Sequence, residues 1–258
     1  MSFHGRFIWY ELLTSDVTAT KAFYSKFLGW TFDDMDMGGP IYSVVNVEGA
    51  GVGGMMGITP EIAAMGVPPC WTGYVAVDDC DASAAKVKTL GGSVMREPAD
   101  IPGIGRFAIV ADSAGAAIAI MTPRPPEGAR PEVPKGAVGS SAWRELYGTD
   151  PKTGFSFYAD LFGWTADEAM DMGPEHGVYQ LFSNQDGQVG GMMKKPGMVP
   201  VACWTYYFQV DDVDAQVEPV KAGGGQVLMG PMDVPGGRVF QATDPQGAVF
   251  ALYSGKAQ

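Results

Sequence analysis

The sequence predicts an α+β protein in which one strand–helix–strand–strand–strand module, βαβββ, occurs four times. Three observations support this prediction. Segments from the first half of the 258-residue chain return about 134 residues later, in the same order. Within each half, an apolar strand followed by an acidic helix cap occurs twice. Short apolar strands separated by glycines follow each helix.

The duplication defines two repeats and a connection between them. The copies are too long for solenoid repeats, so we expect two similar domains, at residues 1–122 and 138–258. Residues 123–137 are rich in proline and lack a regular spacing of apolar residues, which predicts a linker there. The matched pairs are "WYELLTSD" and "WRELYGTD", "FYSKFLGWT" and "FYADLFGWT", "VGGMM" in both repeats, "CWTGYVAVDDCDA" and "CWTYYFQVDDVDA", "DIPGIGRF" and "DVPGGRVF", and "DSAGAAIAI" and "DPQGAVFAL".

The first module begins with an apolar strand over residues 7–13. Asp16 then provides a helix N-cap, Phe23 and Phe27 share one helix face, and Gly29 ends the helix. Glycine-separated strands are expected near residues 31–36, 41–47 and 52–57.

The second module repeats this order. A strand over 72–77 leads to Asp78 and Asp79 as the cap, and a helix over 80–89 stops at two glycines. The strands that follow are expected near residues 93–95, 106–111 and 116–121.

Composition excludes several classes of function. The net charge of −12, without a basic cluster, argues against nucleic-acid binding. No apolar window is long enough to span a membrane, and the N-terminal residues lack the pattern of a signal peptide, so we expect a cytoplasmic protein. Three cysteines form neither a disulfide framework nor a metal knuckle, and the chain has only two histidines.

The ordered set of duplicated segments resembles the vicinal-oxygen-chelate superfamily, which includes glyoxalase I, extradiol dioxygenases and bleomycin-resistance proteins. The resemblance rests on "FYxxxLGW" on the first helix, "VDDxDA" at the second and "DPxGxxxxL" on the last strand, and it covers both repeats. More narrowly, the chain is similar to tandem glyoxalase-like proteins, including mycobacterial secreted-antigen homologues and anthracycline-cluster proteins. The resemblance implies tandem glyoxalase-like domains whose modules form cup-shaped half-barrels, with helices outside and a cavity inside.

Enzymes of this superfamily hold a divalent metal on the inner wall of the cup. The typical ligands are a His on the first strand, a His or Gln before "VDD", and a Glu after the Gly of "DPxG". The residues at the matching positions are Trp9, Thr72 and Ala119 in the first repeat and Trp143, Thr205 and Ala251 in the second. Their indole and methyl groups offer no lone pair, and a neutral hydroxyl is a poor ligand, so we expect no metal and no cofactor.

Strand alternation extends these positions into an inward face that combines aromatic rings, hydroxyls and small gaps. The opposite faces, such as Ile118 and Phe250, are apolar and should pack against helices. The predicted ligand-binding residues are Trp9, Thr72, Tyr74, Trp143, Tyr147, Thr205, Tyr207, Gln209 and Tyr253.

Glu11 and Glu145 are the candidate catalytic residues, because each follows the mapped Trp by two positions and shares its face. Three interpretations stay open for each carboxylate: a structural ion pair, an anchor for a ligand, or a general base. For the ion pair, Arg106 and Arg238 recur at matching places in the repeats.

Two main hypotheses for function follow. The first is a metal-independent protein that binds a small aromatic or hydrophobic molecule, as drug-sequestering members of the superfamily do. The second is an enzyme of lyase, isomerase or hydroxylase type that uses a pocket Glu as general base. A metal-dependent glyoxalase or dioxygenase fits poorly with two histidines. The sequence also leaves open a non-catalytic scaffold and a homodimer formed through strand edges.

Overall fold

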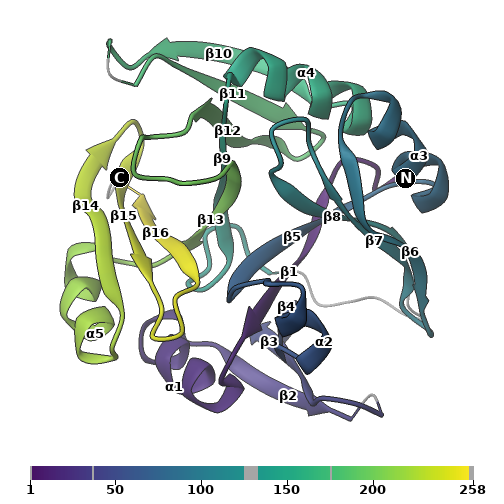
Figure 1. The fold of residues 1–258 in the computed structure, drawn as a ribbon. Coiled ribbons are helices and arrows are strands. Elements are labelled where there is room, and N and C mark those ends of the chain that lie inside the picture. The colour runs from purple at the N-terminus through teal and green to yellow at the C-terminus, as the bar shows by residue number, and fades with distance from the viewer. Residues whose placement is uncertain (1, 37, 125–132, 175, 256–258) are drawn as a thin grey trace. The chain divides into compact units, whose positions relative to one another are not determined.

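The computed structural model describes residues 2–36, 38–124, 133–174 and 176–255 (Figure 1). The first repeat forms β1 (Phe7–Thr14), α1 (Val17–Leu28), β2 (Thr31–Met35), β3 (Tyr42–Val47), β4 (Ala50–Gly57), α2 (Pro60–Ala64), β5 (Cys70–Ala76), α3 (Cys80–Thr89), β6 (Ser93–Ile101), β7 (Gly105–Ala111) and β8 (Ala117–Pro123). The second forms β9 (Ser141–Gly148), α4 (Pro151–Phe162), β10 (Thr165–Asp171), β11 (Val178–Asn184), β12 (Gly187–Lys194), β13 (Cys203–Gln209), the short 3-10 turn η1 (Asp214–Gln216), α5 (Val217–Ala222), β14 (Gln226–Val234), β15 (Gly237–Thr243) and β16 (Val249–Gly255).

The α+β prediction is confirmed. The strands form two eight-stranded sheets, in the orders β2-β3-β4-β1-β5-β8-β7-β6 and β10-β11-β12-β9-β13-β16-β15-β14. Each order contains two βαβββ modules, as the duplicated sequence predicts. No helix in the part of the chain that the structure describes is long and apolar enough to cross a membrane.

The predicted helix caps are confirmed. The Asp16 carboxylate accepts a hydrogen bond from the Ala19 backbone N–H at 2.9 Å, and Gly29 ends α1 in a left-handed conformation. Asp79 caps α3 in the same way. In the second repeat, Pro219 lies inside the corresponding segment, which is divided into η1 and the short α5.

The chain divides into two compact units, and each unit combines one module of each repeat. The first unit contains residues 1–8, 72–129 and 144–205, and the second contains residues 9–71, 130–143 and 206–258. Each unit therefore takes all or most of four strands from each sheet, because the unit boundaries fall near the starts of β1, β5, β9 and β13. The domain boundaries that we predicted at residues 1–122 and 138–258 follow the repeats and stay a prediction, and most of the predicted linker, residues 125–132, lies outside the described residues.

In the first unit a buried series of hydrogen bonds, from an indole to a phenol to a carboxylate, joins the two repeats. Trp204 Nε1 donates to the Tyr158 hydroxyl at 3.0 Å, and that hydroxyl donates to Asp112 Oδ2 at 3.1 Å. The other oxygen of Asp112 accepts from the backbone N–H groups of Ala114 and Ala116 and so holds the turn of "DSAG". Polar atoms on buried aromatic side chains require such partners, so the chain aligns α4 with the turn before β8.

The second unit contains the same arrangement with the repeats interchanged. Trp71 Nε1 donates to the Tyr24 hydroxyl at 3.1 Å, and Tyr24 donates to Asp244 Oδ2 at 3.3 Å. Asp244 Oδ1 accepts from the backbone N–H groups of Gln246 and Ala248. Two of the motifs that carry the family resemblance, "FYxxxLGW" and "DPxGxxxxL", therefore join the two repeats within each unit, together with the duplicated "CWT".

The helices lie on the apolar faces of the strands, as we predicted. Phe250 on β16 is fully buried, and its ring packs against Phe23, Tyr24 and Phe27 of α1 at centroid distances of 5.9, 5.2 and 5.9 Å. Within the first unit α3 and α4 lie side by side, and within the second so do α1 and α5 (Figure 1). The strand face opposite the helices is therefore the face that can carry a site.

The buried Asp244 carboxyl should make stability depend on pH. Burial raises the pKa of Asp244, although hydrogen bonds from Ala248, Gln246 and Tyr24 act in the opposite direction. A raised folded-state pKa contributes stability that is fully present below the unfolded pKa of about 3.9 and is lost as the pH rises through the folded value. We therefore expect the stability of the wild type relative to Asp244→Asn to fall as the pH rises from about 4 to 7. Urea unfolding midpoints of both proteins measure this difference, and a difference that is constant or grows with pH contradicts the expectation.

Candidate functional site

Trp9 and Glu11 of β1 lie beside Tyr42 of β3 in the second unit. Trp9 Nε1 donates to the Tyr42 hydroxyl at 2.8 Å, and the hydroxyl donates to Glu11 Oε2 at 3.1 Å. All three side chains are half-buried. This set, called here the Trp9–Tyr42–Glu11 cluster, confirms that the two predicted residues share a face and adds a tyrosine that sequence reasoning missed.

A glycine beneath the tyrosine makes the cluster fit. Gly54 on β4 pairs with Glu11 in the sheet, and a Cβ atom at Gly54 would lie only 2.1 Å from the Tyr42 hydroxyl oxygen. The ring of Tyr42 therefore occupies the space of the missing side chain and reaches Glu11. Gly191 and Tyr179 have the same relation in the other unit, at 2.2 Å from the ring. The duplicated "VGGMM" was the sequence signal for these two tyrosines.

Tyr42 acts as a hydrogen-bond donor rather than as an anion. Burial, followed by the negative charge of Glu11, raises the pKa of Tyr42 well above its ordinary value, and the hydrogen bond from Trp9 opposes this shift. The phenol therefore keeps its proton at physiological pH, and its bond to Glu11 is charge-assisted.

Three predicted ligand-binding residues of the second repeat gather around Ala251 in the second unit. Tyr207, Val239 and Ala251 form a buried cluster against which Trp143 and Tyr253 pack. Gln241 Nε2 donates to the Tyr207 hydroxyl at 2.7 Å, so this aromatic wall also contains a buried amide that the sequence analysis missed. Gln209 follows Tyr207 by two residues on the same face of β13, and its side-chain amide donates to the Val210 carbonyl.

The corresponding wall of the first repeat lies in the first unit. Tyr74 pairs with Ala119 across β5 and β8, and its ring stacks on Phe107 at 6.1 Å. Thr72 shares the face of Tyr74 and is half-buried. The guanidinium of Arg96 lies 4.6 Å from the Phe107 ring centroid. In the second repeat, Val239 occupies the position of Phe107.

Glu145 has a different environment from Glu11. Its side chain is only 7% exposed, on β9 of the first unit, where it shares a strand face with Tyr147. Burial, followed by the charge of Glu145, raises the pKa of Cys203 to about 11, and Lys195 acts in the opposite direction. Thr205, two residues after Cys203, is also buried. Glu145, Cys203 and Lys195 thus form one electrostatic group, in which the thiol stays protonated.

The two recurring arginines are held by aspartates at the surface. Arg106 binds Asp81 through Nε and Nη2 at 2.6 and 2.9 Å and also reaches Asp100. This contact lowers the pKa of Asp81 below its ordinary value. Both arginines therefore bind aspartates at helix starts and in hairpins, so they do not supply the partners that the ion-pair interpretation of Glu11 and Glu145 would need.

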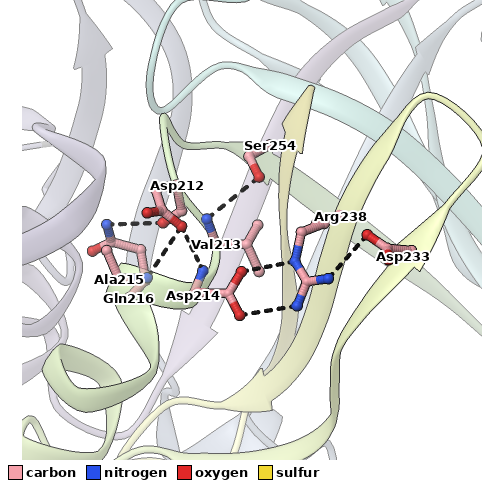
Figure 2. A network of polar contacts seen from close by, with 8 residues as sticks. All are labelled: Asp212, Val213, Asp214, Ala215, Gln216, Asp233, Arg238 and Ser254. Atoms are coloured by element: carbon pink, nitrogen blue, oxygen red, sulfur yellow. Dashed lines mark hydrogen bonds and ion pairs between the residues drawn. The ribbon is translucent and has the colours of Figure 1, made fainter. Parts of the chain in front are cut away.

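Figure 2 shows the second of these networks. Arg238 forks onto Asp214 at 2.7 and 2.9 Å and contacts Asp233 at 2.9 Å. Asp212, just before η1, accepts hydrogen bonds from the backbone N–H groups of Asp214 and Ala215. The network connects the start of η1 with the β14–β15 hairpin, which is a structural role.

Comparison with known proteins identifies the family. The sequence profile of the Glyoxalase/Bleomycin resistance protein/Dioxygenase superfamily matches residues 6–120 and 141–252. The chain belongs to this superfamily. The resemblance inferred from the duplicated segments is confirmed, and one family match falls on each repeat.

Related sequences include proteins of Mycobacterium and Streptomyces. The chain is 36% identical over 247 residues to "Putative glyoxylase CFP32" of Mycobacterium tuberculosis, covering 95% of this chain and 92% of the relative. It is 33% identical over 256 residues to "Anthracycline biosynthesis protein DnrV" of Streptomyces peucetius, covering 95% and 91%.

Solved structures of the superfamily share the fold at low identity. The Mn(II)-bound glyoxalase from Novosphingobium aromaticivorans matches with a TM-score of 0.65 and 17% identity, over 98% of this chain and 83% of that one. The dioxygenase LapB from Pseudomonas sp. KL28 matches with a TM-score of 0.64 and 15% identity, over 99% and 93%. At these identities the likeness shows the fold alone.

The residues at the superfamily's metal positions do not fit a divalent metal. Ala119 and Ala251 have no donor atom and are fully buried, and Ala251 lies within the apolar cluster of Tyr207 and Val239. Trp9 uses its only N–H to bind Tyr42. Within the described ranges, no three or more His, Cys, Asp and Glu side chains lie together in a group that would hold a metal.

Proposed function

We propose that the protein binds a small aromatic or hydrophobic molecule without a metal of its own, as a sequestration or resistance protein does. The observation that carries the proposal is the Trp9–Tyr42–Glu11 cluster, in which Tyr42 links the half-buried Glu11 carboxylate to the Trp9 indole. Trp9 stands where the resemblance places the first metal ligand of the superfamily's enzymes. Apolar and aromatic walls with a few placed polar groups are the usual composition of small-molecule sites. The wall of Trp143, Tyr207, Gln241 and Tyr253 has the same character.

The curated relatives suggest the chemical class of the ligand. Two Streptomyces proteins that are 33% identical to this chain are named for anthracycline biosynthesis, and anthracyclines contain a polycyclic aromatic core. We therefore propose a fused-ring aromatic molecule as the ligand. Such a ring system would stack on the exposed parts of the tryptophan and tyrosine side chains.

Purified protein should bind a fused-ring probe equally well before and after removal of metals. We expect an anthracycline aglycone at 100 times its dissociation constant to stabilise the fold by about 2.7 kcal/mol, because the ligand binds the folded state only. Thermal unfolding of chelator-treated and untreated protein, together with elemental analysis, measures this. A stoichiometric transition metal, or binding that disappears with the chelator, would contradict metal independence.

An enzyme remains the second candidate, and the buried Glu145 is the observation that favours it. A carboxylate that is 7% exposed and shares a strand face with Tyr147 has the environment of a general base. In this case Glu145→Gln would keep the affinity for the ligand and lose turnover, measured by mass spectrometry of the ligand after incubation. If the mass spectrum of the ligand is unchanged after incubation with either the wild type or the variant, binding without reaction is favoured.

The cytoplasmic location and a homodimer through strand edges stay predictions. Light scattering of the purified protein measures the oligomeric state, and cell fractionation measures the location.

A further inference from the structure

Arg96 on β6, the edge strand of the first sheet, lies in a row of side chains that crosses four strands (Figure 1). In the sheet register Arg96 pairs with Ile109, and Ile109 pairs with Ala119. Ala119 in turn pairs with Tyr74. Residues that pair across neighbouring strands project from the same face, so the row includes the position where the resemblance places a metal-binding Glu, now Ala119.

A contact with an aromatic ring independently places the guanidinium on this face. The guanidinium of Arg96 lies 4.6 Å from the centroid of Phe107, and Phe107 stacks on Tyr74 at 6.1 Å. Phe107 is two residues from Ile109 on β7, so both project from the face of the row. Phe107 is 6% exposed, whereas Arg96 is exposed. The ring therefore holds the arginine side chain and leaves its charge in contact with solvent.

The N–H donors of the Arg96 side chain remain available for a ligand. Arg6, Arg106 and Arg238 each bind an aspartate. Among the residues that the structure describes, the Arg96 guanidinium has neither an ion-pair partner nor a hydrogen-bond acceptor. A guanidinium carries five N–H donors in a planar fork that matches the two oxygens of a carboxylate. The row thus offers a positive charge with the geometry for an acid.

The second repeat has the same row without the charge. In the second unit Met229 pairs with Gln241, and Gln241 pairs with Ala251. The register shifts just before Met229 as it does just before the arginine of β6, so the same bulged backbone presents a different side chain in each repeat. Gln241 donates to the Tyr207 hydroxyl, whereas the first repeat has the half-buried, apolar Ile109 at this position. Only the first of these two rows combines a cation with an apolar neighbour.

We propose that Arg96 binds the carboxylate of an acidic aromatic ligand, with the aromatic ring of the ligand against Ile109. This inference rests on the proposed function and adds an acidic group to the ligand. The net charge of −12 disfavours the approach of an acid to most of the protein, so an acidic ligand requires a local cation such as Arg96.

Two isosteric probes test the proposal: 2-naphthoate, which is an anion at neutral pH, and 2-naphthamide, which is neutral. Isothermal titration calorimetry gives both dissociation constants at about 0.15 M salt, where the Debye length of about 8 Å limits the effect of distant charges. We expect naphthoate to bind about tenfold more tightly than naphthamide, because its bond to the guanidinium is charge-assisted at both ends.

Arg96→Met gives the first repeat the residue of the second and should remove this preference. Its affinity for naphthamide should stay unchanged, which also shows that the variant is folded. The matched control is Arg124→Met, which removes the same charge from an exposed position just beyond the end of β8 and should leave the preference intact.

The outcomes separate the acid subsite from the proposed function. Equal affinity of the wild type for the two probes overturns the acid subsite and leaves aromatic binding standing. A preference that survives in Arg96→Met overturns it, because the acid would then bind elsewhere. A preference that is also lost in Arg124→Met overturns it, because the effect would then come from net charge. If neither probe binds, the proposed aromatic binding fails and the acid subsite fails with it.

Discussion

Replacing Phe250 with alanine should lower the free energy of unfolding by about 3–5 kcal/mol, because the ring is fully buried and its removal leaves a cavity. The ring lies edge-on to Phe23 at 5.9 Å and stacks on Phe27 at 5.9 Å, and both belong to α1 of the other repeat. Chemical denaturation measures the loss.

Two further variants show whether the loss comes from packing between the repeats. Val249→Ala, on the neighbouring and 41% exposed position, should change stability by less than about 0.5 kcal/mol. A double-mutant cycle of Phe250→Ala and Phe23→Ala should give a coupling energy of about 0.5–1.5 kcal/mol. Additive effects in this cycle would contradict direct packing of α1 on β16.

Gly139→Ala should destabilise the protein by about 3 kcal/mol or more, because two effects combine there. Gly139 has φ +83°, which an L-residue adopts at a cost of about 1–2 kcal/mol. A Cβ atom would also lie 2.5 Å from the Leu28 carbonyl oxygen and 2.6 Å from Trp30 Nε1. The hydrogen bond from Trp30 Nε1 to the Gly139 carbonyl, 2.9 Å long, would then be displaced.

Gly136→Ala is the matched control for this prediction. Gly136 has φ +80°, but a Cβ atom there would meet nothing within 4 Å, so its variant reports the backbone cost alone. Gly5→Ala repeats the experiment in the first unit, where Trp164 Nε1 donates to the Gly5 carbonyl at 2.7 Å. Equal unfolding midpoints for Gly136→Ala and Gly139→Ala would show that the contact with Trp30 contributes nothing.

The local structure was predictable because its causes are local. Asp16, Asp79 and Gly29 determine where helices begin and end through their own side chains and backbone, and the structure has these caps. Pro219 shortens the last helix for a reason equally visible in the sequence. The short α2 was missed although Thr59 and Pro60 form a start signal, because the segment lies between modules and has no apolar period.

The site was predictable in part. Strand alternation placed Trp9 and Glu11 on one face, and it placed Trp143 and Tyr253 against the wall of Tyr207. It could not find Tyr42 or Gln241, because each reaches its partner across an intervening strand, and the sequence does not state the register of these strands. The same limit explains why the sequence could only leave an ion pair of Glu11 or Glu145 with Arg106 or Arg238 open, whereas these arginines bind Asp81 and Asp214.

The sequence by itself determined the duplication, the four modules, the superfamily and the replacement of the metal ligands by Trp, Thr and Ala, since all of these depend on residue identity and spacing. Only the tertiary structure decided which modules pack together. Tyr24 and Tyr158 are equivalent in the two repeats, as are Asp112 and Asp244, so the sequence offers each tyrosine two chemically identical partners. In the folded chain each tyrosine binds the aspartate of the other repeat, because each compact unit buries one module of each copy.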